Sequence, residues 1–68
     1  MVQWLGRITM SDEVAHQAYL GENPIVDFTY IHKSGRENTR QMELNRAILL
    51  AEERRNDKRY KNYEFHIG

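Results

Sequence analysis

The residues that could do chemistry gather at the end of the chain, in RRNDKRYKNYEFHIG (54–68). Cations are interspersed there with tyrosine and phenylalanine. Basic side chains neutralise phosphates while neighbouring aromatic rings stack on bases, so this composition is typical of a surface that binds single-stranded nucleic acid. A nucleic-acid-binding module would use the six residues Arg54, Arg55, Lys58, Arg59, Tyr60 and Lys61.

The same segment also fits the end of a helix followed by a half-buried strand. If residues 60–67 alternate as a strand, the core face holds Tyr63, Phe65 and Ile67. Only Tyr60 then remains as a stacking platform. Basic residues in the last turn of a helix are favoured by the helix dipole whatever the function. We therefore rank nucleic-acid binding as the alternative hypothesis.

Patterns typical of catalysis or metal binding are missing. The histidines His16, His32 and His66 lack the spacing of metal ligands, and only a sheet that placed the last two side by side would pair any of them. Ser11 and Ser34 carry no nucleophile signature, and the isolated glycines form no phosphate loop. We therefore expect a protein that is not an enzyme and that uses no cofactor and no metal.

The composition limits the cellular compartment and the kinds of partner that we expect. The 68 residues carry ten basic and ten acidic side chains and no cysteine. Small domains in oxidising compartments usually need disulfides, and no apolar run is long enough to span a membrane, so we expect a cytoplasmic protein without membrane contact. Residues 1–32 hold one basic and four acidic side chains, whereas residues 33–68 hold nine and six. The molecule is expected to be a dipole unless the fold interleaves its halves.

Three segments have clear local signals. Residues 2–10 alternate as a strand. Ser11 is a good N-cap for a helix that Gly21 ends. Residues 25–33, IVDFTYIHK, are β-branched and aromatic, which predicts a second strand. One face of that strand holds Val26, Phe28 and Tyr30.

The segment that follows has two interpretations. Asn38 with Gln41 is a capping-box pattern, and the strong helix formers after it favour one helix over residues 39–57. Alternatively, residues 39–44 fold back as a strand and the helix begins at Asn45. We favour the single helix. The chain is then one small α+β domain, 1–68, in the order strand, helix, strand, helix, strand. Both helices pack on one face of a three-stranded sheet, which the alternative would make four-stranded.

The long helix is apolar on more than one side. Its inward stripe comprises Leu44, Ala47, Ile48 and Ala51. Met42 and Leu49 point away from that stripe, and Leu50 lies on a third side. A chain this short has little second layer to cover them, so they are candidates for a dimer interface, for contact with a partner protein, or for packing under the other helix.

The leading hypothesis is a small non-catalytic interaction module that docks on another protein and modulates it, as an inhibitor. Proteins of this size are often inhibitors encoded by phages or mobile elements, and this frequency, rather than any residue, suggests a viral source. The cations of residues 54–59 would steer the encounter. Homodimerisation through the long helix is compatible with this hypothesis. The candidate partner-binding residues are Trp4, Leu5, Met42, Leu49 and Leu50.

One stretch resembles a known family. The first helix followed by IVDFTYIHKSGRENTR is similar to the opening helix and hairpin of WYL-type ligand-sensing domains, through Phe28-x-Tyr30, then Ser34-Gly35-Arg36 and a later Arg40. The resemblance covers about a quarter of the chain, and the family's Trp-Tyr-Leu signature is absent. It implies a strand over residues 39–44 and makes Arg40 a candidate contact for an anionic or nucleotide ligand. A WYL-like ligand or nucleic-acid sensor fragment is thus a further alternative.

Overall fold

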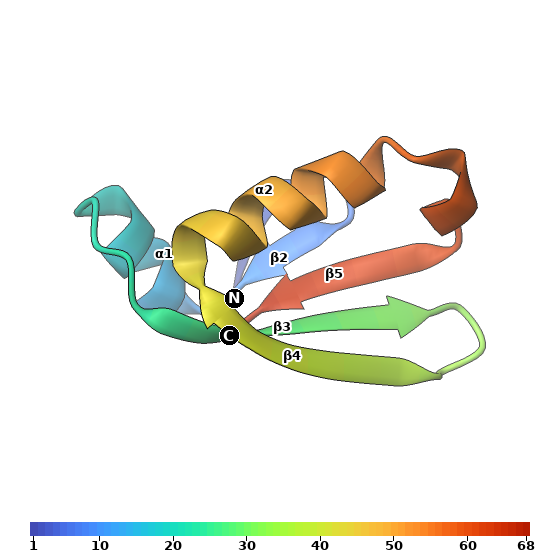
Figure 1. Ribbon diagram of the computed structural model, residues 1–68, viewed down its shortest axis with the longest axis horizontal. Helices are drawn as coiled ribbons and strands as arrows, with labels where there is room; N and C mark the ends of the chain where they lie inside the picture. The colour runs from blue at the N-terminus through green and yellow to red at the C-terminus, as the bar shows by residue number, and fades with distance from the viewer.

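The computed structural model describes residues 1–68 and contains one five-stranded sheet, two α-helices and a short 3-10 helix (Figure 1). The strand order is β1-β2-β5-β3-β4. The α+β class is confirmed, whereas the prediction of three or four strands is wrong. In chain order the elements are β1 (Val2–Leu5), β2 (Ile8–Met10), α1 (Asp12–Tyr19), β3 (Ile25–His32), β4 (Glu37–Glu43), α2 (Leu44–Arg55), η1 (Lys58–Tyr60) and β5 (Tyr63–Ile67).

The first correction is at the N-terminal strand. Residues 2–10 form two short antiparallel strands, because the chain reverses at Gly6 and Arg7. Gly6 has φ +48°, a left-handed conformation that glycine adopts without the steric cost of a β-carbon. The pairing register also shifts between Gln3 and Leu5. An alternating pattern of apolar residues continues through such a turn, which is why the sequence read as one strand.

The second correction is at residues 37–43, which form β4. The favoured single helix over 39–57 is wrong, and the alternative with a strand before the helix is confirmed in outline. β4 pairs with β3 over seven residue pairs, from Ile25 opposite Glu43 to Ile31 opposite Glu37. Pairing over this length satisfies the backbone of a hairpin whose turn is already favoured by Gly35, and it overrides the local helix propensity.

α2 is capped by a distant segment. Glu43, which precedes the helix, makes no side-chain cap hydrogen bond. Instead, the Asn45 N–H donates to Asn23 Oδ1 at 2.8 Å. The Leu44 N–H donates to the Pro24 carbonyl at the same distance. The start of α2 therefore depends on the loop before β3, and the capping-box pattern earlier in the sequence is not used.

α1 begins as predicted. Ser11 has an extended backbone, and its side-chain oxygen accepts a hydrogen bond from the Val14 N–H at 3.3 Å. Asp12 and Glu13 occupy the first turn, where the helix dipole favours negative charge. Gly21 follows the helix with φ +77°. Local signals alone therefore determine both ends of this helix.

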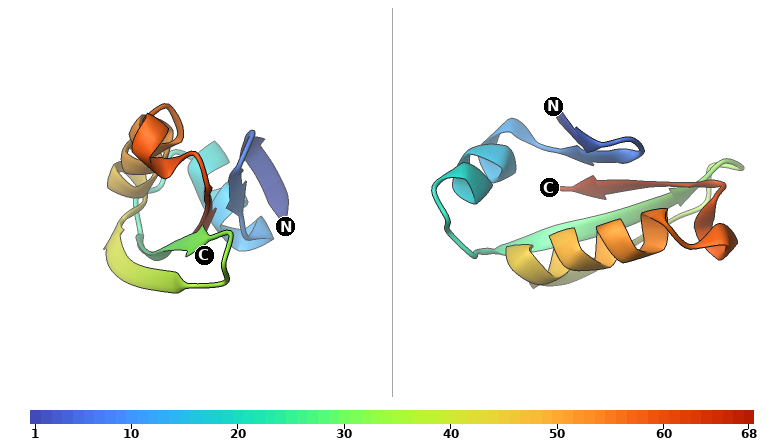
Figure 2. Two further views of the ribbon diagram at one scale, coloured as in Figure 1. Left: turned by 90° about the vertical axis from the view of Figure 1, so that its right-hand side faces the viewer. Right: turned by 90° about the horizontal axis from the view of Figure 1, so that it is seen from above.

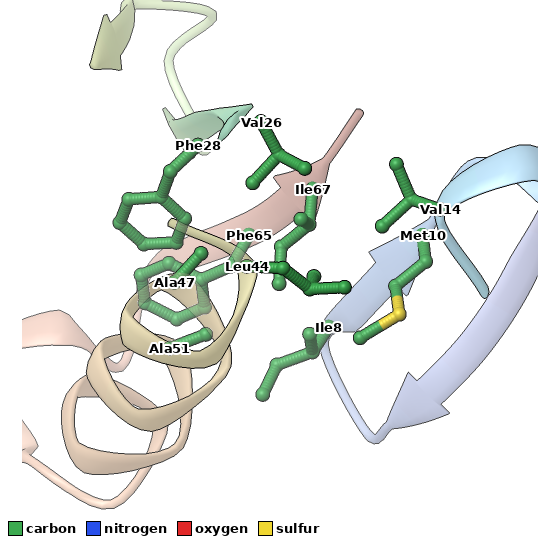
Figure 3. Close-up of a cluster of buried hydrophobic side chains, with 10 residues drawn as sticks. All are labelled: Ile8, Met10, Val14, Val26, Phe28, Leu44, Ala47, Ala51, Phe65 and Ile67. Carbon is green, nitrogen blue, oxygen red and sulfur yellow. The ribbon is translucent and has the colours of Figure 1, made fainter. Parts of the chain in front are cut away.

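The core lies between α2 and the sheet, with α1 at one end (Figures 1 and 2). Both helices contribute to one cluster, as expected, although α1 buries only Val14. Phe28 and Phe65 stack with ring centroids 6.0 Å apart, which confirms the predicted inward faces of β3 and β5. The cluster comprises Ile8, Met10, Val14, Val26, Phe28, Leu44, Ala47, Ala51, Phe65 and Ile67 (Figure 3).

Candidate functional site

One edge of the sheet exposes apolar side chains. All four residues of β1 are exposed. Half of the large apolar side chains on the surface belong to the first five residues. Trp4 is 41% exposed and Leu5 is 43% exposed. Apolar groups clustered on a surface favour contact with another molecule more than isolated ones do.

α2 extends this apolar surface. Trp4 Nε1 donates a hydrogen bond to Glu52 Oε1 at 3.4 Å, which brings the indole to the side of the helix. Leu49 lies three residues before Glu52, so their side chains are neighbours on the helix surface. Leu49 is 50% exposed. We refer to Trp4, Leu5 and Leu49 as the apolar edge.

The other two candidate partner-binding residues lie elsewhere. Met42 is in β4, opposite Val26, and it is half-buried against the core. Leu50 is also half-buried against the core. The structure therefore gathers three of the five candidate contacts on one surface and places Met42 and Leu50 in the packing of the domain itself.

Three tyrosines meet beneath the last turn of α2. Tyr30 comes from β3, Tyr60 from η1 and Tyr63 from β5. Ring centroids are 6.1 Å apart for Tyr30 and Tyr63, and 5.3 Å for Tyr60 and Tyr63. The Arg54 guanidinium lies 5.4 Å from the Tyr30 centroid and 5.0 Å from that of Tyr60. His32 packs edge-on against Tyr63 at 5.0 Å. We refer to these five residues as the tyrosine cluster.

The cluster changes the roles expected for the closing residues. Tyr60, the proposed stacking platform, is half-buried with Arg54 over its ring. The Arg55 side chain instead packs against Gly6 in the β1–β2 turn. Its Nε lies 2.7 Å from the position that a β-carbon would occupy if Gly6 were replaced by a larger residue. Lys58 is exposed. The proposed nucleic-acid-binding residues therefore lie on different sides of the end of α2.

Arg59 is held by a neighbouring carboxylate. Asp57 accepts hydrogen bonds from the Arg59 backbone N–H at 2.9 Å and from its Nη2 at 2.8 Å. The side-chain hydrogen bond from Arg59 lowers the pKa of Asp57 below its ordinary value, and the same bond raises the pKa of Arg59. Because Asp57 also caps η1, this pair fixes the turn that delivers Tyr60.

Arg7 ties this end of the molecule together. Its Nη1 donates to the carbonyls of Tyr60 at 2.8 Å, Lys61 at 2.6 Å and Tyr63 at 3.1 Å. Its Nη2 donates to the carbonyl of Arg55 at 2.8 Å. One guanidinium thus joins the β1–β2 turn to α2, η1 and β5. No sequence pattern indicates this role of Arg7, because the four acceptors are backbone groups.

A cavity of about 390 Å³ opens beside the tyrosine cluster. Tyr30 stands opposite Asn38 across the β3–β4 hairpin, and His32 stands opposite Tyr63 across the β3–β5 pair. These pairings bring aromatic, cationic and amide groups into one hollow. Sequence reasoning missed it, because the only available signal was the register of β4, which we read as helix. The lining residues are Tyr30, His32, Arg36, Glu37, Asn38 and Tyr63.

The histidines remain apart. His66 pairs with Thr29, three positions before His32 on β3, so the two rings lie on opposite faces of the sheet. The His66 Nδ1 is 3.0 Å from the Thr9 hydroxyl. No group of three or more histidine, cysteine, aspartate or glutamate side chains converges as metal ligands do.

Comparison with protein-family models, curated proteins and solved structures found no match to this chain. The strand that the WYL resemblance implied is present as β4. No family model supports that resemblance. Neither helix has the length and apolar character that crossing a membrane requires.

Proposed function

We propose that this protein is a non-catalytic interaction module that docks on another protein through the apolar edge and modulates it, as an inhibitor. The observation that supports this proposal is the exposed indole of Trp4 on a strand at the edge of the sheet. Tryptophan is among the residues that contribute most to protein interfaces. Leu5 and Leu49 supply further exposed apolar surface.

The position of β1 explains how a partner would be held. An edge strand leaves one row of backbone N–H and C=O groups unpaired, and an extended segment of a partner adds to such an edge. β1 has only four residues, so strand addition supplies few hydrogen bonds. The affinity must therefore come mainly from side chains, with the indole of Trp4 filling an apolar pocket of the partner.

The proposal predicts a large effect at Trp4. Truncation of a central aromatic contact typically costs 2 kcal/mol or more, which weakens binding about 30-fold or more. The domain itself should stay folded, because the indole is 41% exposed and its one hydrogen bond, to Glu52, is long at 3.4 Å. We expect Trp4→Ser and Leu49→Asp to lose the partner and to keep the circular dichroism spectrum of the wild type.

The experiment is affinity capture from nuclease-treated lysate of the source organism with matched variants. Wild-type protein and Gln41→Ala, which changes an exposed residue of β4 on the other edge, should retain one protein in equal amounts. Trp4→Ser and Leu49→Asp should both lose it. Retention by all four proteins would contradict docking through the apolar edge. A wild-type molar mass of two chains that Leu49→Asp reduces to one would identify a second copy as the occupant.

A further inference from the structure

Two hollows meet at the hairpin end of the sheet, which comprises the β3–β4 turn, η1 and the start of β5. The first is the cavity of about 390 Å³ lined by Tyr30, Arg36 and Asn38. The second, of about 520 Å³, contains Lys33, Lys61 and Asn62. They share His32 and Tyr63, whose rings pack edge to face at 5.0 Å. This aromatic pair therefore borders both hollows.

The first hollow contains one cation without a carboxylate partner, Arg36. The molecule has two ion pairs, Asp12 with the terminal amino group and Asp57 with Arg59, so Arg36 takes part in neither. Arg54 does not line the first hollow, but it stacks on Tyr30, whose ring does. The positive charge of Arg54 thus lies next to the Tyr30 ring that lines the hollow. Arg36 is therefore available to an anion.

The second hollow adds further positive charge. Lys33 and Lys61 line it without an ion pair. Arg7 also lines it, although its guanidinium donates to backbone carbonyls. Each hollow contains one carboxylate, Glu37 in the first and Glu64 in the second. The formal charge of the lining is therefore neutral in the first hollow and positive in the second.

Cationic segments gather at this end of the long axis (Figure 1). The β3–β4 turn, the end of α2 and η1 lie together there, far from α1. The acidic first turn of α1, with Asp12 and Glu13, lies at the opposite end. The acidic first turn of α1 therefore lies away from the cations of the hairpin end, and those cations would draw an anion toward it.

We propose that the hairpin end binds a phosphorylated nucleoside. Aromatic walls suit the flat face of a base, and stacking on tyrosine tolerates any base. Arg36 supplies a planar donor that matches phosphate oxygens, and Asn38 offers both a donor and an acceptor to the edge of the base. A cavity of about 390 Å³ suits a ligand of this size. The same chemistry is presented by a free nucleotide and by a unit of single-stranded nucleic acid.

This site is separate from the apolar edge, so the proposal of nucleotide binding does not depend on the proposal of protein docking. Trp4 and Leu49 line neither hollow. The residues proposed from the closing sequence contribute here in part: Lys61 lines the second hollow and Arg54 backs the first.

The test is a set of NMR titrations of the isotope-labelled protein with four probes: AMP, adenosine, inorganic phosphate and a tetra-adenylate oligonucleotide. AMP should shift the backbone amides of Tyr30, Asn38 and Tyr63, and it should bind more tightly than adenosine or phosphate alone. Arg36→Gln should weaken AMP binding about tenfold, the size expected for one charge-assisted contact, and leave adenosine unchanged. Arg46→Gln, at an exposed site near the start of α2, is the matched control.

The probes also distinguish the source of the ligand. Tetra-adenylate that binds more than tenfold tighter than AMP, with affinity falling as salt rises, would assign the site to single-stranded nucleic acid. Equal affinity would assign it to free nucleotides. AMP that leaves these amides unshifted, or that binds Arg36→Gln as well as wild type, overturns the proposal. Asn38→Ala changes an exposed side chain, so it tests the same hollow without disturbing the core.

Discussion

The two edges of the sheet are built differently. β1 has four residues, all exposed and none charged. β4 has seven residues, of which Glu37, Arg40 and Glu43 are charged. Natural sheets protect their edges from unwanted pairing by keeping the strand short or by placing charges on it. β1 is protected by its short length, and β4 is protected by its charged residues.

This difference explains why each edge suits a different ligand. A short apolar strand can meet an apolar partner without forming an extended ladder of hydrogen bonds. A long charged strand resists another strand and leaves its cations free for an anion. Arg36 follows this pattern: it stands just before β4, next to the cavity, and it makes no ion pair. The apolar edge and the hairpin end are therefore two independent surfaces on one small domain.

The largest expected effect comes from removing the link between the two regions. Arg7→Ala deletes four hydrogen bonds that join the β1–β2 turn to the hairpin end. We expect a loss of about 3 kcal/mol, because water replaces only part of these charge-assisted bonds. For a domain of this size, that corresponds to a melting temperature lower by roughly 15 °C.

Calorimetry with a matched control would measure this effect. Arg46→Ala removes an exposed arginine on α2 that makes no recorded hydrogen bond or ion pair, so its melting temperature should match the wild type. A wild-type melting temperature for Arg7→Ala would show that the two regions are not joined through this guanidinium.

The second effect concerns protection of the edge strand. Glu37→Thr combined with Arg40→Thr leaves β4 long, exposed and nearly uncharged. We expect this double variant to self-associate by strand pairing, with a molar mass above that of the wild type at equal concentration. Light scattering after size-exclusion chromatography measures it. If the double variant keeps the wild-type mass, charge is not what protects β4.

The smallest expected effect is a change of stability with pH at η1. The pKa of Asp57 is lowered in the folded state by its hydrogen bond from Arg59. The charged carboxylate therefore stabilises the fold above the unfolded pKa of about 3.9, and this contribution disappears as pH falls through the lower folded value. Asp57→Asn keeps an oxygen that can cap η1 but loses the charge.

Melting temperatures across pH test this sign. The variant should be slightly less stable than the wild type at neutral pH. The difference should begin to shrink below about pH 4 and vanish as pH falls through the lower folded pKa of Asp57. A difference that grows on acidification would contradict the assigned cause. The effect should be small, because the Arg59 side chain of this pair is 83% exposed.

The sequence predicted elements whose signals are local and failed where the signal is distant. Ser11 and Gly21 determine the ends of α1 within a few residues. The start of α2 depends instead on Asn23, which caps it from 22 positions away. A capping-box pattern at Asn38 competed with that distant cap, and the hairpin overrode it. Local propensity cannot reveal which of the two signals is used.

The candidate surfaces were predictable to different degrees. Trp4 and Leu5 were named from the sequence as candidate contacts, and both are exposed in the structure. The hairpin-end hollows could not be predicted, because Tyr30 and Tyr63 meet only through the pairing of β3 with β5. Tyr63 was assigned to the core face of its strand, and Tyr30 was placed on the same face of its strand as Val26 and Phe28. They do lie on those faces, but beyond the point where α2 fully covers them, so they remain half-buried.

Photo-crosslinking in living cells tests docking through the apolar edge most directly. A photoreactive phenylalanine analogue would replace Leu49 on the apolar edge or, as the control, Gln41 on β4. We predict one discrete protein adduct at position 49, lost when Trp4→Ser is added, and none at position 41. The absence of an adduct at position 49, or the same adduct at both positions, would contradict docking through the apolar edge.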